Sequence, residues 1–338
     1  MQQFKILVLT DHTNHSAENS LYALLKITHL HPMCQYVDVA TRGNSSNDFF
    51  FREHIPKELF VSKVDENFEF SKDGFFLNKN LKRKDVASYD VIWLRMPPPL
   101  SADFLNFLSE TFPNQLIINS PEGILETGSK RFLLNFPTVT PPMQVCNSVA
   151  DIMDFKKSFP IVLKPFREYG GKGIVRIDGE KVWSANQEMT FDDFVKTLDT
   201  DNIEYLGVQY LKNVSQGDKR IVIVNGEIMG ASLRLPPKDS WICNVAMGGS
   251  SNPSEVDDDE REIIHHIHPL LSKMGIVMYG VDTLVGNEGK RILSEINTTS
   301  IGGLPQIAKQ VKQPLVEKAI DLIFKYVQKN KCKDVVTK

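Results

Sequence analysis

The feature of this sequence that most restricts its fold is a predicted β-hairpin that carries polar side chains among apolar ones. Strands are expected over residues 279–285 and 291–296, on either side of a Gly-Asn-Glu-Gly turn. Glu295 and Asn297 are two residues apart and share a face, and antiparallel pairing about residue 288 brings Asp282 opposite Glu295 within a residue or so. Like charges placed so close repel unless a cation lies between them, so the hairpin favours a Mg²⁺ site. The alternative is a pair of unrelated carboxylates on an exposed hairpin, which the apolar neighbours of these residues disfavour.

Short apolar segments in the N-terminal third predict a parallel sheet. Strands are expected over residues 5–9, 35–39, 91–94 and 116–118, and the segment 16–31 has helical spacing of its apolar residues. This order of strand, helix and strand begins a doubly wound α/β layer. The polar segment 41–84 has no clear period, and we interpret it as a short β-meander over an irregular insertion.

After Asn119-Ser120-Pro121 the pattern changes to α+β lobes. The expected elements are helices over 130–135, 191–198, 257–274 and 313–327, and strands over 161–164, 173–177, 206–211, 220–224 and 227–235, besides the hairpin above. The pair Asn225-Gly226 is a strong hairpin signal. We therefore predict an N-terminal domain over 1–119, a central lobe over 120–205, a C-terminal lobe over 206–330 and a tail over 331–338.

Composition excludes several classes of protein. The chain has 338 residues and a formal net charge of -3, which gives no electrostatic reason to expect a nucleic-acid partner. No apolar run approaches the ~18 residues of a membrane span, and the N-terminus lacks the pattern of a signal peptide. The four cysteines form no CxxC pair. A reducing cytoplasm and small-molecule partners are the expectation.

A glycine-rich loop follows Lys164, at the end of a predicted strand. Glycines such as Gly170 and Gly171 let the backbone approach a phosphate closely and offer N–H donors. The loop is not a P-loop, because it lacks the GK[ST] sequence before a helix. A hairpin with a flexible turn is the alternative interpretation.

Two other polar segments are candidates for ligand binding. Asp218 could hold a ribose hydroxyl, and the guanidinium groups of Arg220 and Arg234 suit carboxylate or phosphate, although ordinary exposed strand charges would look the same. The small-residue run 244–249 follows the loop 236–243 and could form a lid, or an ordinary loop.

In their order along the chain, these segments resemble the ATP-grasp ligases, and among them the prokaryotic type of glutathione synthetase. The resemblance covers nearly the whole chain and is strongest between Lys164 and Asn297. Such a series is far more specific than any one motif. The matching segments are Leu94-Arg95-Met96-Pro97-Pro98-Pro99, Asn119-Ser120-Pro121, Lys130, Lys164-Pro165 with Gly170-Gly171, Gln209-Tyr210-Leu211, Gly217-Asp218-Lys219-Arg220, Arg234-Leu235-Pro236, Asn244, Gly248-Gly249, Gly280-Val281-Asp282 and Glu295-Ile296-Asn297-Thr298-Thr299-Ser300.

The resemblance implies an ATP-grasp fold preceded by a Rossmann-like pre-ATP-grasp domain, and it implies roles for individual residues. ATP would be bound at its phosphates by Lys130, Lys164, Gly170 and Gly171, at its adenine by Gln209, Tyr210 and Leu211, and at its ribose by Asp218. Asp282, Glu295 and Asn297 would hold Mg²⁺ or Mn²⁺, and Arg220 and Arg234 would be catalytic. Arg95, Asn244, Gly248, Gly249 and Ser300 would bind the other substrates.

The resemblance also implies an activity: an ATP- and Mg²⁺-dependent ligase that forms an amide through an acyl phosphate. Glutathione synthesis from γ-glutamylcysteine and glycine is the expected reaction, in a cytoplasmic homo-oligomer, a dimer or a tetramer.

The sequence departs from the family pattern around the substrates rather than around ATP. Ile301-Gly302-Gly303-Leu304-Pro305-Gln306 stands where the family has Pro-Thr-x-Ile-Arg-Glu, and Ile242 replaces an arginine. Met96 and Pro97 replace a lysine and an acidic residue. Two alternatives therefore stay open: another ATP-grasp peptide or amino-acid ligase, such as one that adds glutamate, and a non-catalytic nucleotide-binding protein. The complete set of Asp282, Glu295 and Asn297 argues against the second.

Overall fold

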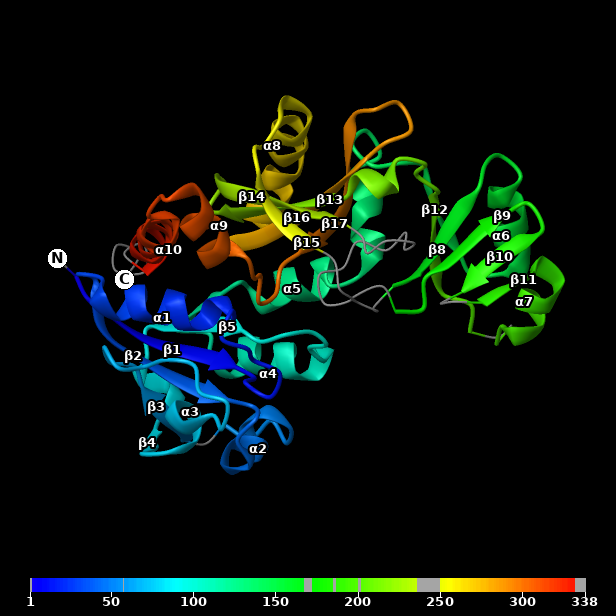
Figure 1. Ribbon diagram of the computed structural model, residues 1–338. Coiled ribbons are helices and arrows are strands. Elements are labelled where there is room, and N and C mark those ends of the chain that lie inside the picture. The colour runs from blue at the N-terminus through cyan, green and yellow to red at the C-terminus, as the bar shows by residue number, and fades with distance from the viewer. Residues whose placement is uncertain are drawn as a thin grey trace.

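The computed structural model describes residues 2–56, 58–166, 172–184, 187–199, 202–235 and 250–331, and these residues build three sheets (Figure 1). The predicted residues Gly170, Gly171, Asn244, Gly248 and Gly249, and the whole predicted lid over 236–249, lie outside the described residues. None of the helices in the described ranges has both the length and the apolar character that crossing a bilayer requires.

The first sheet has the strand order β4-β3-β2-β1-β5-β6. Its parallel part, β2-β1-β5-β6, confirms the four strands predicted in the N-terminal third. β3 and β4 add an antiparallel edge from the segment 41–84, which the sequence analysis interprets as a short β-meander over an irregular insertion. The strands are β1 (Phe4–Thr10), β2 (Cys34–Thr41), β3 (Leu59–Lys63), β4 (Lys82–Lys84), β5 (Val91–Arg95) and β6 (Leu116–Ile118).

Both faces of the first sheet are covered. Ile6 and Val8 of β1 belong to one apolar cluster with α1 and α10, whereas Leu7 and Leu9 belong to another with α2 and α4. This explains why β1 is a continuous apolar run rather than an alternating one. A Rossmann-like character of this domain stays a prediction. The helices of this part are α1 (Ser20–Leu30), η1 (Ser45–Asn47), α2 (Asp48–Phe51), α3 (Phe75–Asn78), η2 (Val86–Ser88), α4 (Ala102–Thr111) and α10 (Leu315–Lys331).

The second sheet is antiparallel, with the order β11-β10-β9-β8-β12-β7. The strand predicted over 206–211 is found as β12, but it pairs with β8 and β7 of this sheet rather than with the strands that follow it in sequence. The domain boundaries stay a prediction. The elements are β7 (Met143–Cys146), α6 (Val149–Lys156), β8 (Ile161–Pro165), β9 (Val175–Asp178), β10 (Lys181–Ser184), β11 (Gln187–Thr190), α7 (Phe191–Thr197) and β12 (Tyr205–Gln209).

The third sheet has the order β15-β14-β13-β16-β17 and is also antiparallel. The predicted hairpin at Asn225-Gly226 joins β13 and β14, and both residues have the positive φ that such a turn requires. The elements are η4 (Val214–Gln216), β13 (Asp218–Val224), β14 (Glu227–Leu235), β15 (Ser250–Ser254), α8 (Asp258–Lys273), β16 (Met278–Val285), β17 (Arg291–Asn297) and α9 (Leu304–Val311).

Asn119 fixes the third sheet against the end of the first. Its amide nitrogen donates to the carbonyls of Met278 and Thr298, both at 2.7 Å, and its amide oxygen accepts from the backbone of Val277 and Met278. The side chain is buried, and these bonds satisfy its two donor hydrogens and its acceptor. α5 (Pro121–Thr127) and η3 (Lys130–Asn135) then lead to the second sheet.

A buried ion pair lies between the third sheet and α8. The Lys219 ammonium is 2.7 Å from a Glu260 carboxylate oxygen, and Glu260 is completely buried. The same carboxylate accepts from the Thr283 hydroxyl and from the backbone N–H of Asp257, which closes the capping box at the start of α8.

We expect Lys219→Met to lower the free energy of unfolding by about 3–5 kcal/mol, because among the described residues the buried Glu260 carboxylate then keeps only the Arg291 guanidinium, at 3.9 Å, as a cationic partner. The double variant Lys219→Met/Glu260→Gln should lose less of the free energy of unfolding. Its glutamine still offers an uncharged oxygen that accepts the capping hydrogen bond at the start of α8. Lys318→Met is the matched control: it breaks a pair that is 49% exposed on both sides, and should cost less than about 1 kcal/mol. Urea unfolding measures all three, and a Lys219→Met variant as stable as the control would contradict the analysis.

Candidate functional site

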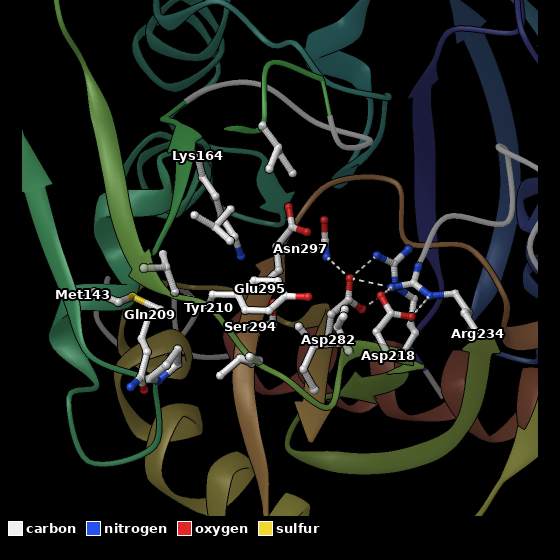
Figure 2. Close-up of a pocket in the computed structure, with 18 of the residues that line it drawn as sticks. Met143, Lys164, Gln209, Tyr210, Asp218, Arg234, Asp282, Ser294, Glu295 and Asn297 are labelled. Carbon is white, nitrogen blue, oxygen red and sulfur yellow. Dashed lines mark hydrogen bonds and ion pairs between the residues drawn. The ribbon is translucent and has the colours of Figure 1, made fainter. Parts of the chain in front are cut away.

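A cavity of about 380 Å³ lies between the second and third sheets, with lining residues from both (Figure 2). Its lining is apolar on one part and charged on the other. The apolar part comes from Met143, Val162, Ile174, Val208, Leu211 and Leu284. The polar part comes from Lys164, Asp218, Arg220, Arg234, Asp282, Ser294, Glu295 and Asn297.

The register of β16 and β17 brings the three predicted metal ligands together. Asp282 pairs with Glu295 and Gly280 pairs with Asn297, as the sequence predicted. The register shifts after this pair, where Ser294 of β17 is the extra residue opposite the Asp282–Thr283 step, and the Asn297 amide nitrogen is 3.3 Å from an oxygen of Asp282. The hairpin therefore places two carboxylates and an amide at one end of the cavity.

Two arginines from neighbouring strands bind the Asp282 carboxylate. Arg220 of β13 donates through Nε at 2.7 Å and through a terminal nitrogen at 2.6 Å. Arg234 of β14 reaches Asp282 at 2.9 Å and also donates through Nε to Asp218 at 2.7 Å. Figure 2 shows these contacts as a continuous network of two guanidinium groups and two carboxylates.

The network separates the pKa values of its two carboxyl groups. Burial alone would raise the pKa of Asp282, but Arg220 and Arg234 outweigh it and hold that pKa at about 2. Burial and the nearby charge of Asp282 raise the pKa of Asp218 to about 6, despite its pairing with Arg234. Two ionised carboxylates that share an arginine repel each other, so one of them binds a proton more readily. As the pH falls, Asp218 is protonated before Asp282.

Lys164 reaches the cavity from the second sheet, at the end of β8. Burial lowers the pKa of its ammonium and Lys130 lowers it further, while Glu295 opposes both. Lys130 itself lines a smaller adjoining cavity, together with Glu295. The two predicted phosphate-binding lysines thus both lie near Glu295.

The segment Gln209-Tyr210-Leu211, which begins with the last residue of β12, lines the cavity. Its backbone is held by hydrogen bonds from the amides of Gln209 and Tyr210 to the carbonyls of Pro142 and Pro160. The Asn287 side chain donates to the Tyr210 carbonyl at 3.2 Å. The segment is therefore fixed before any ligand arrives.

Ser300, a predicted substrate-binding residue, lines the cavity in a backbone conformation with positive φ, but Arg95 does not reach the wall. The Arg95 guanidinium is buried behind it, where it donates to the Ile301 carbonyl at 2.8 Å and to the Ser20 hydroxyl at 3.0 Å. Burial lowers the Arg95 pKa to about 10. In this structure Arg95 supports the segment that forms the wall.

Several lining residues were absent from the sequence prediction. Met143 comes from β7, a strand too short to give a periodic signal. Pro98, Ser294, Thr299 and Ile301 also line the cavity. Thr299 could have been found, because it lies within the matched run that ends at Ser300, whereas Ser294 and Ile301 carry no sequence signal of their own.

Comparison with known proteins identifies relatives over most of the chain. The family described as prokaryotic glutathione synthetase, ATP-grasp domain, matches residues 129–312. The glutathione synthetase of Bradyrhizobium diazoefficiens is 32% identical over 246 residues, 72% of this chain and 75% of the relative. That of Buchnera aphidicola is 30% identical over 263 residues, 75% of this chain and 77% of the relative.

Solved structures share the fold at much lower sequence identity. A D-cycloserine synthetase superposes with a TM-score of 0.63 and 13% identity, covering 96% of this chain and 99% of its own. The D-alanine–D-alanine ligase of Bacillus anthracis, complexed with ATP, superposes with a TM-score of 0.58 and 15% identity, covering 98% of this chain and 99% of the ligase chain. These likenesses establish the ATP-grasp fold.

The raised pKa of Asp218 predicts a pH dependence of stability. A carboxyl whose folded pKa of about 6 exceeds the ordinary value of 3.8 binds its proton more tightly in the folded state. The free energy of unfolding should therefore fall as the pH rises from about 4 to about 6. Asp218→Asn should remove this part of the pH dependence in urea unfolding curves, while Asp199→Asn, on a turn outside the cavity lining, should retain it. Parallel curves for wild type and Asp218→Asn would contradict the assignment.

Proposed function

The chain belongs to the prokaryotic glutathione synthetase family of ATP-grasp proteins, and we propose that it is an ATP-dependent ligase that joins γ-glutamylcysteine to glycine. The observation that carries this proposal is the two-sided cavity. An apolar wall that suits a nucleotide base adjoins a cluster of cations and carboxylates that suits a triphosphate and a metal ion.

The nucleotide would lie along the cavity, with its base against the apolar wall and the segment 209–211. Lys164 and Lys130 would contact its phosphates, because the two ammonium groups repel each other and an anionic phosphate near both would relieve that repulsion. Asp218 would contact the ribose. Since both of its oxygens already accept from Arg234, a ribose hydroxyl would share those oxygens rather than displace the arginine.

Mg²⁺ or Mn²⁺ would be held by Asp282, Glu295 and Asn297. Their oxygens are the hard donors that such ions prefer, and the two arginines already show that this end of the cavity attracts positive charge. The described part of the chain holds no cluster of three or more His, Cys, Asp or Glu side chains suited to a metal, so ATP phosphates would complete the coordination. The bound ion supplies charge neutralisation for the transferred phosphoryl group.

The reaction would proceed in two steps. The carboxylate of the acid substrate attacks the γ-phosphorus of ATP, ADP leaves, and an acyl phosphate forms; the amine then attacks the acyl carbon and phosphate leaves. Arg220 and Arg234 would orient the substrate carboxylate and the transferred phosphoryl group, as guanidinium groups bind both in a planar fork. Lys164 would hold the phosphates, and the apolar walls would exclude water from the acyl phosphate.

A second candidate is an ATP-grasp ligase with a different acid or amine. The observation that favours it is the wall formed by Ser300 and Ile301, where the family pattern has an arginine shortly after this position and this chain does not. Arg95 does not compensate, because it lies behind the wall. The nucleotide end of the cavity would be the same in both cases.

The setting of the enzyme follows from the same proposal. It would act on small molecules in the cytoplasm as a homo-oligomer, a dimer or a tetramer, without a nucleic-acid or membrane partner. The net charge of -3 is in keeping with this setting.

Glu295→Gln should reduce turnover by about 10²–10³-fold while the protein stays folded, because it removes one of two carboxylates proposed to hold the metal. Glu288→Gln, in the exposed turn of the same hairpin, is the matched control and should turn over normally. ADP release measures turnover, and titration with Mn²⁺ measures the loss of metal affinity independently. Normal turnover by folded Glu295→Gln would exclude its role.

With ATP, Mg²⁺ and γ-glutamylcysteine, addition of glycine should release ADP and yield glutathione. Glutamate and alanine in place of glycine, and γ-glutamyl-alanine in place of γ-glutamylcysteine, form the comparison panel. ADP release is coupled to NADH oxidation, and the product is identified by mass spectrometry. Activity with another pair but none with γ-glutamylcysteine and glycine would favour the second candidate.

A further inference from the structure

Arg176 of β9 lies beside the apolar wall of the cavity without lining it. It pairs across the second sheet with Val162 of β8 on one side and Trp183 of β10 on the other. Val162 lines the cavity, and opposed residues of an antiparallel pair point to the same face, so Arg176 points to the cavity face of the sheet. A charged side chain beside the apolar wall needs contacts that stabilise its charge.

The Arg176 guanidinium is packed between two aromatic rings. Its central carbon lies 4.0 Å from the ring centre of Tyr210 and 4.6 Å from that of Trp183. We call this arrangement the Trp183–Arg176–Tyr210 stack. Among the described residues its ion-pair partner is Asp178, at 3.4 Å, and the buried Arg176 Nε has no hydrogen-bond partner there. The two aromatic rings therefore provide much of the surroundings of the guanidinium plane.

Tyr210 is the member of the stack that lines the cavity. Its backbone is fixed by the carbonyl of Pro160 and the side chain of Asn287, but these bonds leave the ring free to turn. The planar guanidinium of Arg176 supplies the contact that orients the ring, and Trp183 supports the guanidinium from its far side. An arginine can do this because its charge is spread over a plane, whereas the lysine ammonium is a compact, strongly hydrated charge.

We propose that Arg176 is a positioning residue for the nucleotide, which acts by holding the Tyr210 ring in the orientation that forms the pocket for the base. The proposal rests on the ATP site of the proposed function and deepens it. The shape of the base pocket would then depend on an arginine that contacts Tyr210 but not the nucleotide. Nucleotide affinity, rather than the chemical steps, depends on this contact.

The test compares Arg176→Met and Arg176→Lys with the wild type. Both variants should bind ADP about tenfold more weakly by calorimetry, and should raise KM for ATP with kcat little changed, because both lose the planar contact. Arg83→Lys is the matched control, because Arg83 also lies over an aromatic ring, that of Phe60 at 5.8 Å, but in the first sheet. The Arg83→Lys variant should bind ADP as tightly as the wild type. Thermal unfolding checks that each variant is folded. If Arg176→Met does not fold, Arg176→Lys becomes the test variant.

A double-mutant cycle with Tyr210→Leu separates action through the ring from direct contact with the nucleotide. If Arg176 acts through Tyr210, then Arg176→Met should cost little further ADP affinity in the Tyr210→Leu background. Additive losses, full rescue by Arg176→Lys, or unchanged ADP affinity in folded Arg176→Met would each overturn the inference alone. Failure of the wild type to bind ADP would overturn it together with the proposed function.

Discussion

The binding of one buried carboxylate by two arginines organises the site of this protein. Asp282 lies on β16, and Arg220 and Arg234 come from β13 and β14, the two strands next to it on one side. Asp282 is 4% exposed, so its charge is stable only because these cations are close. Each arginine is in turn held in place by the carboxylates it binds. Removal of any one member would leave a buried charge without its partner, which ties the geometry of the cavity to the stability of the sheet.

The same arrangement has a chemical consequence. The guanidinium groups occupy the carboxylate that the proposed metal ion would share, so cation binding at Asp282 would weaken its contacts with Arg220 and Arg234. The arginines would then be available for the anionic groups of substrate and nucleotide. Glu295 and Asn297 enter this balance from β17, on the opposite side of Asp282. A bound cation would therefore add to the positive charge of the two arginines at this end of the cavity, which favours anionic ligands there.

Contacts made far from the cavity hold its walls in place. Asn119 ties the end of the first sheet to the backbone of β16 and of the segment after β17. Arg95, at the end of β5, supports the Ile301 carbonyl behind the wall. Residues of the N-terminal domain therefore shape a cavity that they do not line, apart from Pro98.

The sequence by itself determined the local parts of this structure. Alternation of side chains and the turn around residue 288 were enough to place Asp282 opposite Glu295, and Asn225-Gly226 placed the β13–β14 turn, because both depend on neighbouring residues. The order of matched segments also indicated the ATP-grasp family. Only the tertiary structure decided that β12 joins the second sheet, that Arg95 lies behind the wall and that Arg176 stacks on Tyr210. These contacts join residues distant in sequence, and they depend on how whole sheets pack, which no local period or turn signal encodes.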